Sequence, residues 1–398
     1  MIPVEKARDI VFGTARSFGI ESVSLMESIG RILQESLVAD RDFPPYNRVT
    51  MDGIAIRYSD FLNGTRRFKI TGVGAAGKPQ GLLTDANCCL EIMTGAILPD
   101  GSDTIIRYED VHLENGFATV NSATIREGQN IHRKGSDRSI GSELLQKGYH
   151  LNASSIGVAA TVGKSQIMVS KLPKVMIIST GDELVEVDAK PLPHQIRKSN
   201  VYQLQAILQS MKISSNHLHL MDDLKGITEV LKTILNDYDV VLLSGGVSKG
   251  KFDFLPEAMK ENGVEKLFHK IKQRPGKPFW FGQYPNGATV FAFPGNPVSS
   301  FMCAQIYFIP WLHKCLGLPD PKPKYAKLTG PINFKPDLTY FAQVKIESSD
   351  SGELLATPIE GNGSGDLANL VESNAFLEVP RGQEIFPAGT VLPFVSFL

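Results

Sequence analysis

The sequence predicts a multidomain protein of α/β and β class, in which a doubly wound α/β domain is joined to β-rich parts. Three observations predict this fold. The chain has 398 residues, too many for one simple core, and 42% are hydrophobic and 21% charged, as in ordinary globular proteins. From residue 174 to about 318, patterns of buried strands alternate with helical patterns. On either side of that stretch, short β-like runs are separated by turns.

The first element predicted is an amphipathic helix over residues 3–18. Pro3 suits a first helical turn, and apolar residues recur at helical spacing at Val4, Ala7, Val11, Phe12, Ala15 and Phe18. β-like runs with frequent glycine follow, at 68–73, 88–93 and 103–108, and indicate a β-rich domain. A second helical pattern at 151–160 leads the chain back towards the first helix. We therefore expect a small helical/β domain built from two chain segments.

The α/β pattern and the end of the chain complete the predicted order. Strands are expected at 175–178 and 239–243, with a helix at 201–208. The proline-rich segment 318–323 predicts a semi-rigid linker, and the alternating residues after it predict a small C-terminal β-barrel or sandwich. The predicted domains are 1–42 together with 138–170, then 43–137, 171–319 and 320–398.

Charge and cysteine content exclude several classes of function. Lys and Arg number 41 against 42 for Asp and Glu, so no global field favours nucleic acid or a membrane surface. The amino terminus carries charges in its first turns and has neither a signal-peptide nor a membrane-span pattern, which predicts a cytoplasmic protein. The four cysteines have no metal-ligand spacing, and we expect buried thiols rather than disulfides.

Candidate ligand residues follow the predicted strands of the α/β domain, because open parallel sheets bind ligands beyond the carboxyl ends of their strands. Four loops qualify. They supply Thr180, Gly181 and Glu183 from loop 179–183; Ser244, Gly245, Gly246 and Ser248 from loop 244–248; Arg274, Gly276 and Lys277 from loop 274–278; and Gly295, Asn296 and Ser299 from loop 293–299.

The residue types in these loops suit a phosphate-bearing ligand. Paired glycines let backbone amides close on an oxyanion, and Arg274 and Lys277 add cations. Asp253, with Asp222 after another predicted strand, offers carboxylates for Mg²⁺. Taken singly, each loop is equally consistent with a turn, a helix cap or a solvated charge. Their placement at one sheet edge predicts a shared site.

Three loops outside this domain also carry polar residues: 43–53 with Asp52, 93–96 with Thr94, and 130–137 with Asp137. By themselves they fit plain turns and a solvated basic loop. His217 and His219 are typical of one face of a strand and have no zinc-site spacing.

The ordered set of motifs resembles the molybdopterin molybdenumtransferase family over nearly the whole chain, and also the carboxyl-terminal part of the eukaryotic scaffold gephyrin. The motifs are Pro44-Pro45-Tyr46 to Met51-Asp52-Gly53, Met93-Thr94-Gly95, Arg133 to Asp137, Ser179 to Glu183, Ser244 to Ser248, Pro275-Gly276-Lys277-Pro278 and Pro294-Gly295-Asn296-Pro297.

The resemblance implies a fold, a reaction and partners. It implies a four-domain homodimer in which the α/β molybdopterin-binding domain of one subunit faces the β-rich domain of the other. The implied substrates are adenylylated molybdopterin and molybdate; AMP is released, Mg²⁺ is required, and a molybdopterin adenylyltransferase is a transient partner. Asp222 and Asp253, with Glu183, would hold the metal or orient the attacking oxygen. Asp52, Thr94 and Asp137 would close the cleft from the partner subunit.

The chain departs from the family pattern in places. Asn47 and Val49 stand where an acid and a serine are common, and Arg274 stands where lysine is common. The arginines usual around residues 338–343 are missing, which weighs against a cofactor contact from the last domain, although 361–364 keeps the Gly-Ser turn. Two alternative functions stay open: a molybdopterin adenylyltransferase, which the α/β domain alone resembles, and a gephyrin-like non-enzymatic scaffold.

Overall fold

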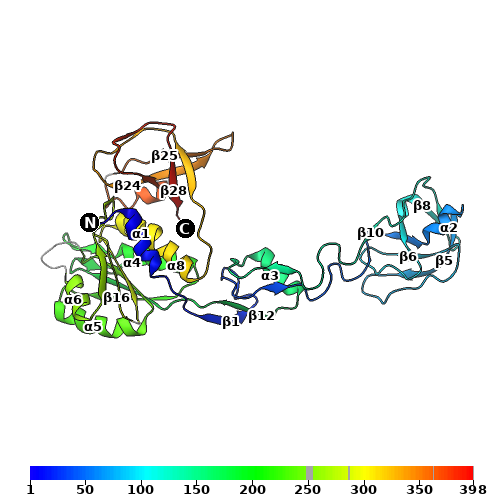
Figure 1. Ribbon diagram of the computed structural model, residues 1–398, viewed down its shortest axis with the longest axis horizontal. Coiled ribbons are helices and arrows are strands. Elements are labelled where there is room, and N and C mark those ends of the chain that lie inside the picture. Colours follow the sequence, from blue (N-terminus) through cyan, green and yellow to red (C-terminus); the bar gives the residue numbers. More distant parts are fainter. Residues whose placement is uncertain (248–253, 286, 362, 398) are drawn as a thin grey trace. The chain divides into compact units, whose positions relative to one another are not determined.

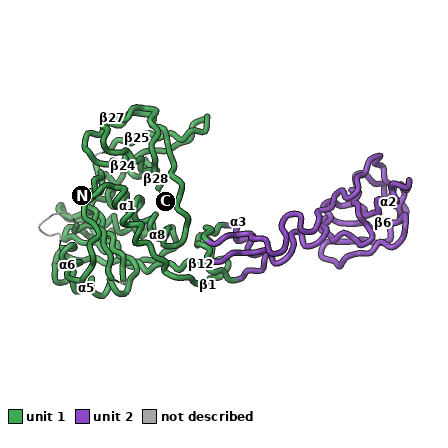
Figure 2. Tube along the Cα trace, in the orientation of Figure 1, with its two compact units in different colours: residues 1–34, 148–152, 166–398 green, residues 35–147, 153–165 purple. Residues whose placement is uncertain are grey.

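The computed structural model describes residues 1–247, 254–285, 287–361 and 363–397. The chain divides into two compact units, which Figure 2 shows in different colours. Unit 1 comprises residues 1–34, 148–152 and 166–398, and unit 2 comprises residues 35–147 and 153–165. No helix among the described residues is long and apolar enough to cross a membrane.

Unit 1 is built around a six-stranded sheet with the strand order β16-β13-β17-β21-β20-β18. The first four strands are parallel, and β20 and β18 are added antiparallel at one edge. The strands are β13 (Val175–Thr180), β16 (Ser215–Leu220), β17 (Val240–Ser244), β18 (Glu265–His269), β20 (Trp280–Gln283) and β21 (Thr289–Phe293).

Helices cover both faces of this sheet (Figure 1). Ile177 and Leu242 pack in a core with α1, α4, α7, η2 and α8, whereas Ile178 and Leu243 pack in a second core with α5 and α6. This alternation follows from the period of two along a strand and confirms the doubly wound α/β fold. The helices are α4 (Ser199–Ser210), α5 (Leu224–Asp237), α6 (Leu255–Glu261), α7 (Pro297–Cys303), the π-helix η2 (Ala304–Phe308) and α8 (Ile309–Cys315).

The first helix is shorter than the sequence predicts. Helix α1 spans Val4–Gly13 and buries the predicted face through Val4, Ala7 and Val11. The chain leaves the helix after Gly13, because Thr14 is its C-cap and donates its hydroxyl to the Val11 carbonyl at 2.7 Å. The expectation that residues 14–18 continue the helix is wrong, although Ala15 and Phe18 still pack on the core.

The two chain segments that flank unit 2 come together in unit 1. Strand β1 (Ile20–Ser24) pairs with β12 (Gln166–Ser170), and Ile32 forms a bridge with His150. The predicted second helix is α3 (Ala153–Thr161), in unit 2, whereas α1 packs on α8 in unit 1. The returning chain therefore meets the residues after α1 rather than α1 itself.

The last part of the chain is a closed β-barrel. β24 pairs with β25 and β26, and the ring continues through β22 and β28. Its strands are β22 (Lys324–Leu328), β24 (Thr339–Ser348), β25 (Leu354–Pro358), β26 (Ala375–Val379) and β28 (Val391–Ser396); β23 (Ile332–Asn333), β27 (Ile385–Phe386) and α9 (Asn369–Glu372) lie between them in sequence. The short strand β19 (Gln273–Arg274) pairs with the start of β24 and ties the barrel to the α/β part.

Unit 2 contains a second six-stranded sheet, with the order β7-β4-β6-β5-β9-β8. The three predicted β runs correspond to β5, β6 and β7. The strands are β4 (Gly53–Ile56), β5 (Arg67–Gly74), β6 (Cys88–Ile92), β7 (Thr104–Arg107), β8 (Val111–Glu114) and β9 (Phe117–Val120). Smaller elements of the unit are β2 (Leu37–Val38), β3 (Arg48–Val49), α2 (Tyr58–Leu62), η1 (Tyr108–Asp110), β10 (Ile131–His132) and β11 (Glu143–Leu145). All four cysteines of the chain are free and buried, as predicted.

Candidate active site

A cavity of about 400 Å³ lies at the carboxyl edge of the parallel strands in unit 1. Loops that follow β13, β17 and β21 form its walls, together with the first turn of α4. Six of the residues predicted from the sequence line it: Thr180, Glu183, Ser244, Gly245, Gly295 and Asn296. The structure therefore brings three of the four predicted loops together at one place, as the doubly wound topology requires.

Positive backbone angles let the loops after β13 and β17 pass close to each other. Gly181, Gly245 and Gly246 have φ values of +131°, +93° and +66°, a region that favours glycine. A Cβ atom on Gly246 would lie 2.7 Å from the Thr180 Oγ1 atom. That hydroxyl is buried and has no hydrogen-bond partner among the described residues, which leaves it available to a ligand.

Asn200 joins two walls of the cavity, and no sequence motif indicated it. Its Nδ2 atom donates to the Ser244 Oγ atom at 2.8 Å and to the Gly295 carbonyl at 2.7 Å. Asn200 lies in the first turn of α4, where a polar side chain is ordinarily solvated or caps the helix. One feature could have indicated Asn200: helix α4 follows the loop after β13, and that loop returns to the same edge of the sheet.

Two further cations line the cavity and were also missed. Arg197 is exposed, and Lys198 is 6% exposed and forms an ion pair with Glu186. The hydrogen bond from Lys198 lowers the pKa of Glu186. Burial, followed by the charge of Lys198, lowers the pKa of His219, so this imidazole stays neutral at pH 7. Its Nδ1 atom lies 3.0 Å from the Ser179 hydroxyl.

The predicted acids lie at neighbouring strand ends. Asp222 follows β16, and its backbone N–H donates to the Asp182 carboxylate in the β13 loop at 3.1 Å. Asp223, by contrast, caps α5 by accepting the Gly226 N–H at 2.7 Å. The Glu183 carboxylate lies over Gly181, 2.6 Å from where a Cβ would be. Two other predicted residues, Ser248 and Asp253, lie outside the described residues.

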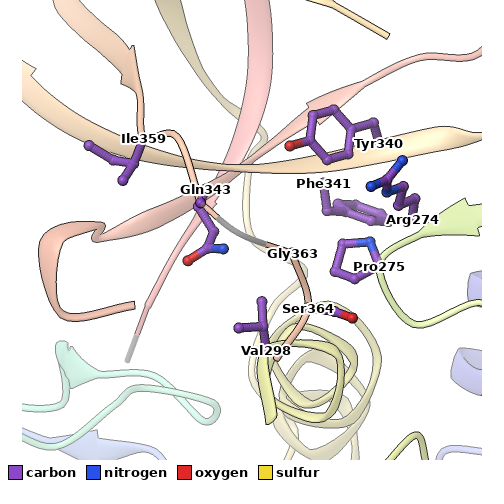
Figure 3. Close-up of a pocket in the computed structure, with 10 residues that line it drawn as sticks. Arg274, Pro275, Val298, Tyr340, Phe341, Gln343, Ile359, Gly363 and Ser364 are labelled. Carbon is purple, nitrogen blue, oxygen red and sulfur yellow. The ribbon is translucent and has the colours of Figure 1, made fainter. Parts of the chain in front are cut away.

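The loop 274–278 borders a neighbouring cavity of about 290 Å³, shown in Figure 3. Arg274 lines it with Tyr340 and Gln343 from the barrel and Val298 from α7. The barrel thus contributes to this cavity through residues 338–343, a stretch that contains no arginine. The Gln343 Oε1 atom is buried and has no hydrogen-bond partner among the described residues.

A hydrogen bond connects the two cavities. The Asn296 Nδ2 atom donates to the Ser364 hydroxyl at 2.8 Å; Asn296 lines the first cavity and Ser364 lines the second. The remaining predicted residues have other positions. Lys277 is exposed and lines neither cavity, Ser299 is buried in α7, and Gly276 is buried against Cys303 and Met302.

In unit 2, the three predicted loops lie side by side. The Asp52 carboxylate accepts the Thr94 N–H at 2.6 Å, and this hydrogen bond lowers the Asp52 pKa. Asp137 contacts the His132 Nε2 atom at 2.7 Å. β3 and β10 pair, so Arg48 faces His132, and Val49 hydrogen-bonds to Ala96 and Gly95 of the 93–96 loop. Thr94 and Asp52 are both exposed.

Comparisons with known families match the chain in three successive stretches. Residues 2–163 match the family described as MoeA N-terminal region (domain I and II). Residues 176–314 match the family described as probable molybdopterin binding domain. Residues 325–397 match the family described as MoeA C-terminal region (domain IV).

Full-length relatives and a solved structure agree with these matches. The chain is 40% identical to a protein of Synechocystis sp. named molybdopterin molybdenumtransferase, with 100% of both chains covered. It is 31% identical to a Staphylococcus epidermidis protein of the same name, over 94% of this chain and 90% of the relative. The structure of a molybdopterin biosynthesis MoeA protein from Pyrococcus horikoshii superposes with a TM-score of 0.85 at 28% identity, covering 100% of this chain and 99% of the other. The chain therefore belongs to the molybdopterin molybdenumtransferase (MoeA) family.

Proposed function

We propose that the chain is a molybdopterin molybdenumtransferase. In this proposal it inserts molybdenum from molybdate into adenylylated molybdopterin and releases AMP, which completes molybdenum cofactor biosynthesis. Its full-length similarity to relatives of that name supports the class of reaction. The observation that carries the assignment of the site is the convergence of three strand-end loops on one cavity of about 400 Å³.

The cavity has the donors that a phosphate-bearing pterin needs. The Thr180 hydroxyl has no acceptor among the described residues, and the first turn of α4 presents backbone amides whose helix dipole favours an anion. Arg197 and Lys198 add positive charge on the same wall. We propose that these groups and the amide of Gly246 hold the phosphate, and that Asn200 fixes the distance between the two strand ends. The Gly245 N–H already donates to the Phe293 carbonyl at 3.2 Å, so Gly245 shapes the loop instead.

We propose that Mg²⁺ is held by Asp222 and Asp253, with Glu183 nearby. Among the described residues no group of three or more metal-ligating side chains lies together. Mg²⁺ usually keeps several waters and takes one or two carboxylates plus substrate phosphates, so a small number of acids fits it. The Asp222 N–H to Asp182 contact supports this by bringing the β13 and β16 loops together. Bound there, the ion would neutralise charge on the phosphoanhydride that is cleaved.

Assembly and location are part of the proposal. We propose a homodimer in which the partner subunit's Asp52, the partner's Thr94 and the partner's Asp137 close the cleft over the cavity. We also propose that each subunit has four domains, at residues 1–42 with 138–170, 43–137, 171–319 and 320–398. A cytoplasmic location and a transient contact with a molybdopterin adenylyltransferase complete the proposal.

The direct test is AMP release from adenylylated molybdopterin by the purified chain, with molybdate and Mg²⁺ added or left out. We expect release to depend on both additions. Asp253→Asn should abolish molybdenum insertion, whereas the matched control Asp237→Asn, at an exposed helix end, should retain it. A normal rate of molybdenum insertion in the Asp253→Asn variant would contradict the assignment of that carboxylate as a Mg²⁺ ligand.

The same purified chain distinguishes the transferase from the two alternative functions, an adenylyltransferase and a gephyrin-like scaffold. Incubation with ATP and free molybdopterin, without molybdate, would yield adenylylated product if the chain were an adenylyltransferase. A gephyrin-like scaffold would release no AMP under either condition. The comparisons support neither alternative, since the full-length relatives carry the transferase name.

A further inference from the structure

A third cavity in unit 1, away from the sheet edge, is lined by several basic residues. Its volume is about 290 Å³, and chain segments distant in sequence form its walls. They are the residues after β1, the segment around His150, the end of β12, and the carboxyl ends of α4 and α8. We name it the basic cavity after four of its lining residues, Arg31, His150, Lys212 and His313.

None of the described residues that line the basic cavity is acidic, although the whole chain is almost neutral. Lys212 and His313 lie at helix carboxyl ends, where the helix dipole favours positive charge. Arg31 and His150 come from non-helical segments, so a helix dipole does not account for their position. Burial, followed by the charge of His150, lowers the pKa of His313, as expected for a buried basic group beside another basic group.

Arg31 has unused hydrogen-bonding capacity. It is 8% exposed, donates from one terminal nitrogen to the Ser170 carbonyl at 2.7 Å, and forms an ion pair with Glu21 through the same nitrogen. Its Nε atom is buried and has no partner among the described residues. A buried guanidinium N–H without an acceptor is costly, and a bound anion would relieve that cost.

Among the described residues, His150 contacts a hydrogen-bond partner through one ring nitrogen. Its Nε2 atom lies 3.2 Å from the Gly30 carbonyl, which accepts hydrogen bonds only, so Nε2 carries the proton. Protonation at Nδ1 would then make His150 a second donor for an anion. The Lys212 side chain runs along Gly30, with its Nζ atom 3.9 Å from where a Gly30 Cβ would be, so it lies beside the same wall.

Apart from Gly30, Ser170 and Ser210, the rest of the lining is apolar. Ile32, Leu172, Met211, Leu316 and Leu318 form most of the wall between the basic groups. Apolar surface combined with a few charged groups that fix orientation is the usual composition of a small-molecule site. The volume suits a ligand near the lower end of the size range of such sites, about 300 Å³.

We propose that the basic cavity binds a small organic carboxylate whose apolar body packs on Ile32, Met211 and Leu316. The carboxylate accepts hydrogen bonds from the basic side chains and pairs with their charge. This site is separate from the proposed active site, and the proposal does not depend on the transferase function.

The test uses the full-length chain and two probes of matched shape, 3-phenylpropanoate and its neutral amide. Binding is measured by calorimetry, and the histidine imidazole signals are followed by NMR during the titration. We expect the carboxylate to bind at least about tenfold more tightly than the amide, because the charge-assisted contacts are lost with the amide. The signals of His150 and His313 should move, and that of the exposed His194 should not.

Two variants assign the binding to the basic groups. Lys212→Met keeps the length of the stem, and His150→Gln keeps a donor for the Gly30 carbonyl, so both should remain folded. Each should weaken carboxylate binding about threefold to tenfold. The control Lys174→Met removes an exposed charge elsewhere in unit 1 and should leave binding unchanged.

Several results would overturn the proposal. These are equal affinity for the carboxylate and the amide, no detectable binding at millimolar probe, and unchanged affinity in both variants. Movement of the His219 signal in place of those of His150 and His313 would also overturn it, since it would put the probe at the sheet edge.

Discussion

At the scale of single residues, Asn200 is the side chain that links two strand-end loops of the candidate active site. One side-chain amide bonds both Ser244 and Gly295, which end or follow neighbouring strands. We expect Asn200→Ala to lower kcat/KM for AMP release by about tenfold to a hundredfold, since small displacements of binding groups are costly in catalysis. Asn216→Ala, which removes a similar bond to Tyr238 on the exposed side of β16, is the matched control. Equal rates in the two variants would show that the bridge is unimportant.

Asp52 offers a prediction about pH. The Thr94 N–H holds the carboxylate in its charged form, so its pKa lies below the ordinary value for aspartate. The stabilisation from this bond is present above the pKa of unfolded aspartate and is lost as the pH falls through the lowered folded pKa. NMR titration of the side-chain carboxyl should show the lowered midpoint.

The control for this titration is Asp52→Asn, which keeps an oxygen that can accept the Thr94 N–H. Its thermal midpoint should change less with pH in the acid range than that of the unmodified chain. A midpoint for Asp52 at or above the ordinary aspartate value would contradict the structural account.

The residues at strand ends were predictable, and those at the start of α4 were not. Thr180 and Ser244 end buried strands, and Gly295 lies two residues after one. Parallel topology places such residues together at one edge of the sheet. Asn200 and Lys198 reach the same cavity only because the long loop after β13 returns to the sheet edge. Sequence spacing does not encode that path, so tertiary structure was needed to find them.

At the scale of elements, a buried polar network lies beneath the turn that carries Arg274. The Tyr307 hydroxyl of the π-helix η2 donates to the Gln273 side chain, whose Nε2 atom donates to the Gly276 carbonyl at 3.1 Å. Burial raises the pKa of Tyr307 well above its ordinary value, so the phenol remains a donor. Gly276 has a φ of +79°, and a Cβ there would lie 2.7 Å from the Cys303 sulfur.

We expect Tyr307→Phe to lower the free energy of unfolding by about 1 to 3 kcal/mol, because it leaves the buried Gln273 oxygen without a donor. If the network holds the turn in place, KM should rise more than kcat falls. Tyr202→Phe, at a side chain that is 40% exposed, should change stability by less than about 0.5 kcal/mol. Urea denaturation with steady-state kinetics measures both effects, and a Tyr307→Phe variant as stable as the control would refute the role of the network.

Elements with strong periodicity were predictable, and their ends and pairing were not. The runs at 175–178 and 239–243 became β13 and β17, and the alternation after residue 320 became a closed barrel. The helix over residues 3–18 stopped at Gly13, since a hydroxyl cap at Thr14 outweighs two further apolar positions. The antiparallel addition of β20 and β18 depends on loop geometry, which hydrophobic pattern does not specify.

At the scale of the whole molecule, the proposed dimer makes a prediction about mixed subunits. Asp52→Asn changes unit 2, and Ser244→Ala changes unit 1. If each cleft combines unit 1 of one subunit with unit 2 of the other, a heterodimer of the two variants contains one intact cleft and one doubly altered cleft.

Co-expression with two affinity tags would isolate such heterodimers. We expect them to recover about half of the unmodified rate, while either homodimer stays impaired. Heterodimers as impaired as the homodimers would mean that each site is completed within one subunit.

The interface between the barrel and the α/β part determines whether the barrel can be removed or exchanged. β19 pairs with β24, Arg8 forms a two-pronged ion pair with Glu378, and Phe301 packs against Phe376 and Phe397. A proline-rich linker suggests that the barrel could be removed without harm to the rest of unit 1. These contacts show instead that the barrel covers residues of the α/β part that would otherwise be exposed. A protein truncated at residue 318 should aggregate on expression, and grafting a foreign barrel onto this framework would require redesigning both faces of the seam.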